Sequence, residues 1–287
     1  MKTLLAVDGS DNSYEAVRAL KYLQRADELT ILHVVDVPKP AYPMMVPEVA
    51  HELYAELEHS MKEDGSKLLD RVQSLLPLHA GPVTKRLEVG MPAEVIVTAA
   101  ETGQVDLVVM GARGLGPFKE RLFGSISHRV LTLAPCAKLI VKGALRDIKE
   151  ILLPVQGQYD AAAAVRFMQK NPFKEPINVT LLTVLPSTRP PWPVDPSAAE
   201  KLEAQALQHA RDFIEDTAAK LRTMGHSVRG TSVLGTPAPM IIHEAEKVRP
   251  DVIMMGSRGR QGFTRFVLGS VSHAVLHHAA CAVLVFE

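Results

Sequence analysis

The sequence predicts an α/β protein built from two doubly wound, five-stranded parallel sheets, each with the strand order 3-2-1-4-5. One observation behind this prediction is an internal repeat: residues 90–142 match residues 235–287 at 22 positions when the chain is shifted by 145. A second observation is that short apolar runs alternate with longer amphipathic stretches in each copy. That alternation is typical of a parallel sheet with helices on both faces.

The repeat divides the chain into two domains, residues 1–142 and residues 150–287, joined by a linker at 143–149. Each copy has the usual size of a domain. Near the start of each copy the shift is 148, where Leu4 to Gly9 faces Leu152 to Gly157. Insertions between the copies therefore fall in the connections.

The apolar runs predict the elements in order. In the first copy we expect strands at Thr3–Val7, Leu29–Val35, Val83–Val89, Leu107–Met110 and Lys138–Val141. Helices are expected between them at Ser13–Leu23, Glu48–Leu75, Ala93–Glu101 and Ser125–Leu133. The second copy has strands expected at Ile151–Val155, Val179–Leu185, Ser227–Val233, Val252–Met255 and Ala282–Phe286. Pro-rich segments from Val37 to Pro47 and from Leu185 to Pro196 are expected to break regular structure before a long helix.

Composition narrows the classes of partner. With 47% hydrophobic and 22% charged residues, the chain is typical of a soluble globular protein with enough apolar material for two cores. The formal net charge is zero, so nucleic acid or an anionic membrane is not expected as the principal partner. No apolar run has membrane-spanning length, and Asp8 follows the first apolar run too early for a secretory signal. A cytoplasmic location is the expectation.

Both cysteines occupy the same position in the two copies. Cys136 and Cys281 each come just before an apolar strand. We expect buried thiols, because structural disulfides are rare in a reducing compartment.

The candidate site lies where the strands end. In an open parallel sheet, ligands bind beyond the carboxyl ends of the strands, where the strand order reverses. Asp8 and Gly9 follow the first strand, and a glycine-rich loop follows the fourth. With the order 3-2-1-4-5 the first and fourth strands are neighbours, so these two segments should converge.

The loop after the fourth strand has a repeated pattern that favours phosphate. Gly111-Ala112-Arg113-Gly114 is followed by Gly124-Ser125, and the pattern recurs as Gly256-Ser257-Arg258-Gly259 with Gly269-Ser270. Glycines allow close approach of the backbone, and a helix that starts at Gly-Ser presents amide hydrogens and the positive end of its dipole. The hydroxyls of Ser125 and Ser127 are candidates for further hydrogen bonds, although Ser125 is equally suited to cap the helix. One glycine pair alone would indicate only a tight turn. A P-loop is excluded, because no GxxxxGK[ST] occurs.

These pieces closely resemble the universal stress protein family, in a tandem form with two universal stress protein A domains. The resemblance covers nearly the whole chain. It rests on the opening segment from Leu4 to Ser10, on the repeated Gly90-Met91-Pro92-Ala93 and Gly235-Thr236-Pro237-Ala238, and on the ATP-type motif G-x2-G-x9-G-[S/T] in both copies. The resemblance implies Rossmann-like sheets of the HUP type and a site for ATP or a related adenine nucleotide, with Mg²⁺ accompanying the phosphates.

The resemblance also implies roles for individual residues. The aspartate after the first strand, Asp8, would lie by the adenosine, next to Ala6 and Val7. Val34 and Val184 match the valine whose backbone contacts adenine. Ribose and phosphates would be held by Gly111, Gly114, Gly124, Ser125, Ile126 and Ser127 in the first copy, and by Gly256, Gly259, Gly269, Ser270, Val271 and Ser272 in the second.

The second copy departs from this pattern at one important position. Gln156 stands where Asp8 would be, and with Pro154 and Val155 it forms the candidate nucleotide-binding segment that matches Ala6, Val7 and Asp8. An amide donates and accepts hydrogen bonds but carries no charge. Occupancy of the second site is therefore open, and we expect the first copy to bind better.

Four basic residues near the motifs have two interpretations each. Arg113 and Arg258 would pair with phosphate, or else face solvent or a carboxylate. His128 and His273 recur at equivalent positions on the helix after Gly-Ser, and we expect packed or capping side chains rather than catalytic bases.

Two classes of function stay open besides a nucleotide-binding stress regulator. A weak ATPase or nucleotidyl-transfer enzyme is one alternative, although the loop has no lysine and no paired acidic metal ligands. A nucleotide-free interaction scaffold is the other. The resemblance further implies that the fifth strands, Lys138–Val141 and Ala282–Phe286, pair within the chain as a pseudo-dimer, and that two such chains form a homodimer.

Overall fold

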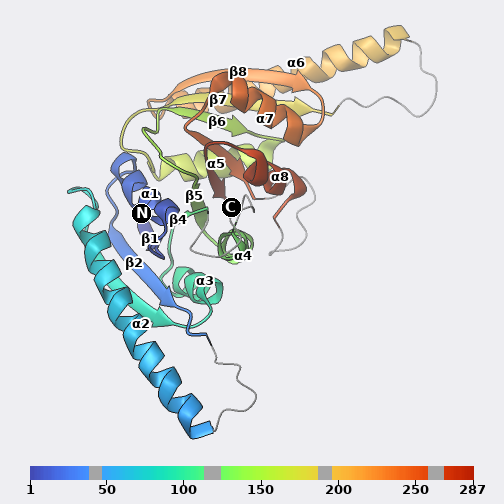
Figure 1. Ribbon diagram of the computed structural model, residues 1–287. Coiled ribbons are helices and arrows are strands. Elements are labelled where there is room, and N and C mark those ends of the chain that lie inside the picture. The colour runs from blue at the N-terminus through green and yellow to red at the C-terminus, as the bar shows by residue number, and fades with distance from the viewer. Residues whose placement is uncertain (39–46, 113–123, 187–195, 258–267) are drawn as a thin grey trace. The chain divides into compact units, whose positions relative to one another are not determined.

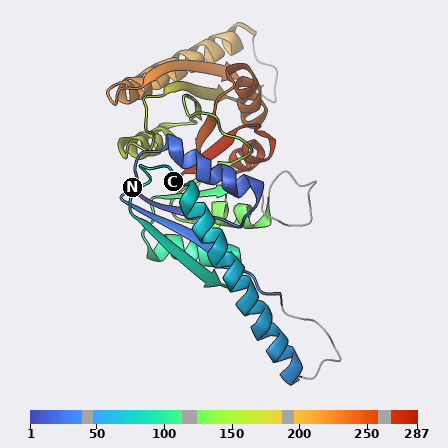
Figure 2. The same cartoon turned by 60° about the vertical axis from the view of Figure 1, so that its left-hand side comes forward.

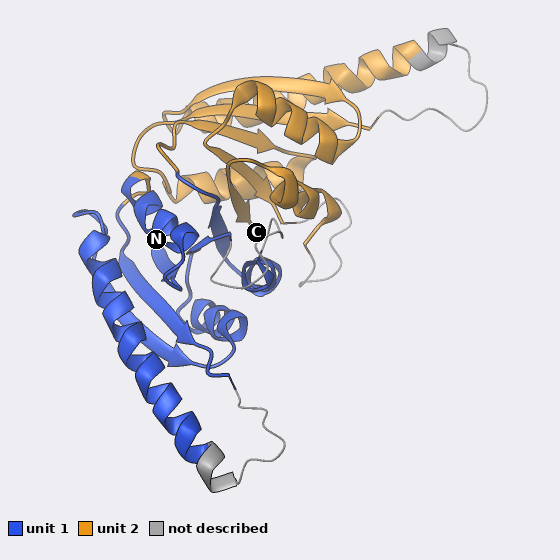
Figure 3. Ribbon diagram, viewed as in Figure 1, with its two compact units in different colours: residues 1–21, 25–144 blue, residues 22–24, 145–287 orange. Residues whose placement is uncertain are grey.

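The computed structural model describes residues 1–38, 47–112, 124–186, 196–257 and 268–287. The chain forms two compact units, which Figure 3 shows in different colours. Unit 1 comprises residues 1–21 and 25–144, and unit 2 comprises residues 22–24 and 145–287. Each unit is a parallel sheet with helices on both faces, so the predicted α/β class is confirmed.

The first unit has the predicted strand order. Its elements are β1 (Lys2–Ala6), α1 (Asp11–Ala19), β2 (Glu28–Val35), α2 (Pro47–Leu75), β3 (Val83–Val89), α3 (Pro92–Thr102), β4 (Leu107–Gly111), α4 (Ser125–Leu133) and β5 (Ala137–Val141). Within this unit the strands lie in the order β3-β2-β1-β4-β5, and all neighbouring pairs are parallel. The strand order therefore reverses between β1 and β4.

The second unit repeats this architecture (Figure 1). Its elements are β6 (Glu150–Pro154), α5 (Gln158–Gln169), β7 (Asn178–Leu185), α6 (Pro196–Arg222), β8 (Ser227–Leu234), α7 (Pro237–Val248), β9 (Val252–Gly256), α8 (Ser270–His278) and β10 (Ala282–Phe286). The order β8-β7-β6-β9-β10 is again parallel at every pair. The reversal now falls between β6 and β9.

Burial on both faces explains the apolar character of the central strands. In the first unit α1 and α2 pack together on one face, and α3 packs with α4 on the other. All five residues of β4 are buried, as expected for a strand with helices on both sides. Leu69 and Val72 anchor the second half of α2 to the sheet, whereas Leu53 and Leu57 in its first half are exposed. That first half extends past the sheet in Figures 1 and 2.

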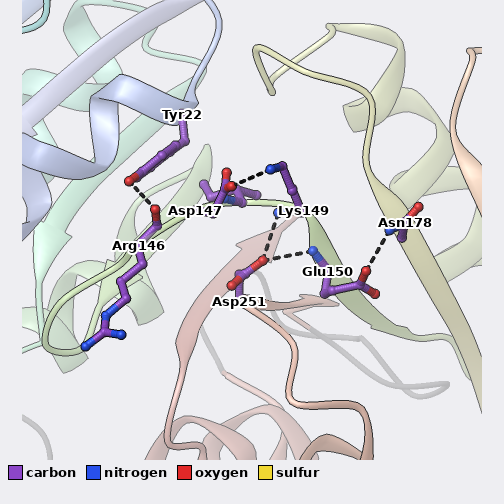
Figure 4. Close-up of polar contacts among 8 residues, drawn as sticks. Tyr22, Arg146, Asp147, Lys149, Glu150, Asn178 and Asp251 are labelled. Atoms are coloured by element: carbon purple, nitrogen blue, oxygen red, sulfur yellow. Dashed lines mark hydrogen bonds and ion pairs between the residues drawn. The ribbon is translucent and has the colours of Figure 1, made fainter.

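An aspartate holds the start of the first strand in each unit. Oδ2 of Asp106 accepts a hydrogen bond from the Lys2 amide at 2.9 Å. In the second unit Oδ2 of Asp251 accepts two, from the amides of Lys149 at 2.8 Å and Glu150 at 2.9 Å (Figure 4). The equivalent bonds align the two strands between which each sheet reverses its order.

The helix predicted at Ser13–Leu23 is shorter than expected. The α-helix ends at Ala19 and continues as a 3-10 turn over Leu20–Tyr22. Leu23 instead forms an antiparallel bridge with Phe173. The hydroxyl of Tyr22 donates to the carbonyl of Arg146 (Figure 4). Tyr22 and Leu23 belong to unit 2, and their contacts there explain why the α-helix does not continue to Leu23.

The remaining expectations about the chain have different outcomes. Cys136 is buried as predicted, whereas Cys281, at the equivalent position before β10, is partly exposed; both are thiols. The Pro-rich segments fall mainly on residues 39–46 and 187–195, which lie outside the described residues. No helix in the described ranges is long and apolar enough to cross a membrane.

Candidate functional site

A cleft opens in the first unit at the carboxyl ends of β1 and β4. The two strands pair directly, with Ala6 beside Met110. The turn after β1 passes through Gly9, whose φ of +80° is a conformation that favours glycine. The described parts of the two segments predicted to converge, at Asp8 and at Gly111, line this one cleft.

Apolar side chains form the walls of this cleft, and few polar groups reach into it. Its volume of about 80 Å³ is several times the roughly 10–15 Å³ that one water needs. Seven predicted residues line it: Ala6, Val7, Asp8, Val34, Gly111, Ile126 and Ser127. The sequence prediction missed five others, which are Ser13, Leu32, Pro92, Ile96 and Met110. Pro92 could have been predicted as a site residue, because it belongs to a motif that occurs in both copies. The other four are ordinary helix or strand residues that only the fold brings to the cleft.

Asp8 is held by the first turn of α1. Its Oδ1 accepts hydrogen bonds from the amide of Ser10 at 3.0 Å and from the Ser10 hydroxyl at 2.6 Å. Ser10 caps α1, because its Oγ accepts the amide of Ser13 at 3.2 Å. Among the described residues no donor reaches the other oxygen, Oδ2. The carboxylate is thus oriented by one oxygen, and the second is available for a ligand in the cleft.

Gly111 is needed for packing as well as for the cleft. A β-carbon at this position would lie 2.7 Å from the carbonyl carbon of Asn12 and 2.8 Å from the amide nitrogen of Ser13. These are backbone atoms at the start of α1, which cannot rotate away. The glycine therefore lets α1 approach β4 closely.

Two groups predicted to hold phosphate are used inside the protein. The amide of Gly124 donates to the carbonyl of Ala112 at 2.9 Å. The hydroxyl of Ser127 donates to the carbonyl of Gly111 at 2.9 Å. Gly124, not Ser125, is the N-cap of α4, so of the two roles considered for the Ser125 hydroxyl the capping role is wrong. These bonds close the loop between β4 and α4 and fix where the helix begins.

The first turn of α4 keeps three amides for another partner. Because a helix cannot satisfy its first N–H groups, those of Ser125, Ile126 and Ser127 have no acceptor within α4. No other described residue accepts them either. Ile126 also lines the cleft. Together with the positive end of the helix dipole, these amides suit an anion.

The second unit reproduces the loop closure. Gly269 caps α8, and its amide donates to the carbonyl of Ser257 at 2.9 Å. The hydroxyl of Ser272 donates to the carbonyl of Gly256 at 2.9 Å. Val271 and Ser270 therefore occupy the same positions in the first turn as Ile126 and Ser125.

The end of β6 differs from the end of β1. The amide of Gln156 donates to Oδ2 of Asp160 at 3.2 Å. Asp160 lies in the first turn of α5, and its burial raises the pKa of the carboxyl group above the usual value, while the hydrogen bond from Gln156 acts in the opposite direction. The second unit thus has a carboxylate at this place, although not on the strand.

Several candidate residues are not assigned to the site. Arg113, Gly114, Arg258 and Gly259 lie outside the described residues. His273 packs against His277 with ring centroids 4.4 Å apart, and no group of three potential metal ligands occurs in the described part of the chain.

The fold and the cleft define a class: two doubly wound α/β domains in one chain, with a cleft in unit 1 where the strand order reverses. The model of the universal stress protein family matches residues 1–142 and again residues 147–287. The chain belongs to the universal stress protein family.

Individual relatives agree with this assignment. A universal stress protein of Bacillus subtilis is 33% identical over 148 residues, which cover 49% of this chain and 98% of that protein. A universal stress protein of Mycobacterium tuberculosis is 27% identical over 300 residues, covering 96% of this chain and 94% of that protein. The crystal structure of a universal stress protein from Archaeoglobus fulgidus superposes with a TM-score of 0.63 at 21% identity, over 99% of this chain and 97% of that one. The Mycobacterium tuberculosis relative is thus similar to this chain along nearly its whole length, and the Archaeoglobus fulgidus structure shares the fold of this chain.

Proposed function

We propose that the chain binds ATP or a related adenine nucleotide in the cleft of unit 1 and acts as a regulator in the stress response. The observation that carries the proposal is that one cleft joins apolar walls, the Asp8 carboxylate and the first-turn amides of α4. These three kinds of surface match the base, the donor groups of a nucleoside and the phosphates of a nucleotide.

The apolar walls suit a planar base. Leu32, Val34, Ile96 and Met110 come from β2, α3 and β4, and they surround the cleft together with Pro92. Binding sites for small molecules are mostly apolar with a few placed polar groups. A base between these side chains would bury its faces and leave its edge for hydrogen bonds with the backbone of β2.

The polar groups suit the rest of the nucleotide. Asp8, an acceptor when ionised, would take hydrogen bonds from an amino group or a ribose hydroxyl. Phosphate oxygens would accept from the amides of Ser125 and Ile126 at the start of α4. Mg²⁺ enters the proposal only as a partner of the phosphates, since it commonly binds through substrate phosphates and water.

The cleft favours binding over catalysis. Among the described residues that line it, Asp8 has the only carboxyl, imidazole or amine side chain. General acid–base chemistry needs a group positioned for proton transfer, and Asp8 is already bonded to Ser10. We therefore propose that nucleotide occupancy, rather than turnover, is the output of the site.

A released-ligand experiment tests the proposal. The purified protein is denatured, and any nucleotide set free is identified by mass. Purified apo protein is then titrated with Mg-ATP by calorimetry. ATP that is retained or bound supports the proposal. Continuing conversion of ATP to ADP would favour the weak-enzyme alternative. If neither experiment detects nucleotide binding, a nucleotide-free interaction scaffold is the function that stays open.

A negative charge introduced at the start of α4 tests whether the phosphates bind there. Ile126→Glu puts a carboxylate beside the proposed phosphates, so we expect ATP affinity of unit 1 to fall at least tenfold. An acidic residue in the first turn stabilises a helix, so the substitution should not unfold α4. Val271→Glu is the matched control in unit 2 and should leave the first site unchanged. If the Ile126→Glu variant bound ATP as tightly as the unsubstituted chain, the assignment of the phosphate site to α4 would be refuted.

A further inference from the structure

We infer that Asp160 supplies the ligand-binding carboxylate of unit 2, in place of the aspartate that is missing at position 156. The inference rests on the proposed nucleotide function and assigns the ligand-facing charge of the second cleft. It predicts that both units bind, with the carboxylate arriving from different elements.

Most residues that line the cleft of unit 1 have identical counterparts in unit 2. With a shift of 150 in the second strand and of 145 from residue 90 onward, the apolar walls of the unit 1 cleft correspond to Leu182, Val184, Pro237, Ile241 and Met255. The changes gather at the end of the first strand and the first turn of the next helix. There Asp8, Asn12 and Ser13 of unit 1 correspond to Gln156, Asp160 and Ala161 of unit 2.

These three changes preserve one hydrogen bond by another route. In unit 1 the amide of Asp8 donates to the hydroxyl of Ser13 at 3.4 Å. Ala161 has no hydroxyl to offer in unit 2. The amide of Gln156 donates to Asp160 instead, at 3.2 Å. The backbone after the strand is held by the helix in both units.

The hydrogen bond from the Gln156 amide does not require a charged acceptor such as the Asp160 carboxylate. The neutral hydroxyl of Ser13 performs the same task in unit 1. Asp160 is partly buried, and burying a carboxylate is more costly than burying a hydroxyl. The amide of Gln156 donates to Oδ2 of Asp160 only, and no described residue donates to Oδ1 of this carboxylate. Asp160 therefore places a carboxylate at the position of the Ser13 hydroxyl, which lines the cleft of unit 1, with one of its two oxygens engaged.

The replacement has a chemical consequence for the ligand. A carboxylate on α5 accepts hydrogen bonds from the same donors as a carboxylate on the strand, namely the hydroxyls of a ribose or the amino group of a base. Gln156 adds an amide that both donates and accepts. Unit 2 keeps the negative charge that position 156 lacks.

The test isolates the second unit in the full-length chain. Ile126→Glu silences unit 1, and Mg-ATP titration in this background reports on unit 2. Asp160→Asn combined with Ala161→Ser removes the charge and restores a hydroxyl acceptor for the amide as in unit 1. We expect at least a tenfold loss of affinity, with the thermal unfolding midpoint of the chain unchanged.

Moving the charge back provides the rescue. Adding Gln156→Asp and Gln158→Ser to the previous variant recreates the arrangement of Asp8, Ser10, Asn12 and Ser13 in unit 1, and affinity should return. Equal affinity with and without the Asp160 carboxylate would overturn the inference. Binding of one ATP in the unsubstituted chain, abolished by Ile126→Glu, would leave the proposed function standing and the Asp160 inference refuted. No binding by the unsubstituted chain would refute both.

Discussion

Replacing Gly111 with alanine should destabilise unit 1, because the added methyl group would overlap the first turn of α1 at Asn12 and Ser13. The new carbon would lie 2.7 Å from the carbonyl carbon of Asn12, 2.8 Å from its Cβ and 2.8 Å from the amide nitrogen of Ser13. Ordinary contacts between carbon atoms are about 3.5–4.0 Å. The first turn of α1 would have to move by roughly 0.8 Å or more to reach that range.

The expected cost follows from this displacement. Overpacking a well-packed region destabilises a protein by about 1–3 kcal/mol. That range corresponds to opening of the unit that is about 5- to 150-fold more frequent. Hydrogen exchange of the α1 and β4 peptides, followed by mass spectrometry, measures this opening directly.

Gly157→Ala is the matched control. Its β-carbon would meet nothing within 4 Å, and its φ of 179° is extended backbone that any residue adopts. We expect exchange in α5 and β6 at the original rate. Unchanged exchange of α1 and β4 in Gly111→Ala, or an equal loss in the control, would refute the close-packing argument.

Three further predictions concern single interactions. Ser127→Ala leaves a buried carbonyl at the end of β4 without its donor, so chemical denaturation should show a loss of about 1–3 kcal/mol; a change near zero would contradict the bond. Burial lowers the pKa of His226, whose Nδ1 accepts a hydrogen bond from the amide of Ile177 at 3.5 Å. The unfolded state therefore binds the proton more readily than the folded state. The stability of the protein should fall as the pH drops below the ordinary histidine pKa of 6.5. His226→Asn keeps an acceptor but does not titrate, and thermal melts should lose this part of the pH dependence; an unaltered acid profile would contradict the assignment. Gly230→Ala would place a β-carbon 2.2 Å from Cγ2 of Ile214, so its thermal midpoint should fall, and adding Ile214→Ala should cost less than the sum of the two single changes; strict additivity would argue against the contact.

The regular elements were largely predictable from the sequence. Val83–Val89, Ser125–Leu133 and Ala282–Phe286 have the predicted bounds, because apolar periodicity is a local signal. The end of α1 was not predictable, since Leu23 leaves the helix to pair with a residue 150 positions away. Pairing between the fifth strands stays a prediction.

The candidate site was predictable in its chemistry and not in its walls. Asp8 and the Gly-Ser helix start have a recognisable pattern, and the structure brings both to the reversal of the strand order. Leu32, Ile96 and Met110 have no such pattern. An apolar residue near a strand end lines a cleft only if the fold leaves space beside it.

By itself, the sequence determined the duplication, the α/β class and the family, because repeats, apolar periodicity and motifs are local features of the chain. Only the tertiary structure decided which polar groups are left for a ligand. The amide of Gly124 and the hydroxyl of Ser127 close the loop of unit 1, and Asp160 brings a carboxylate to the end of β6. The physical reason is that a hydrogen-bonding group serves a ligand only when no neighbour in the fold has already engaged it.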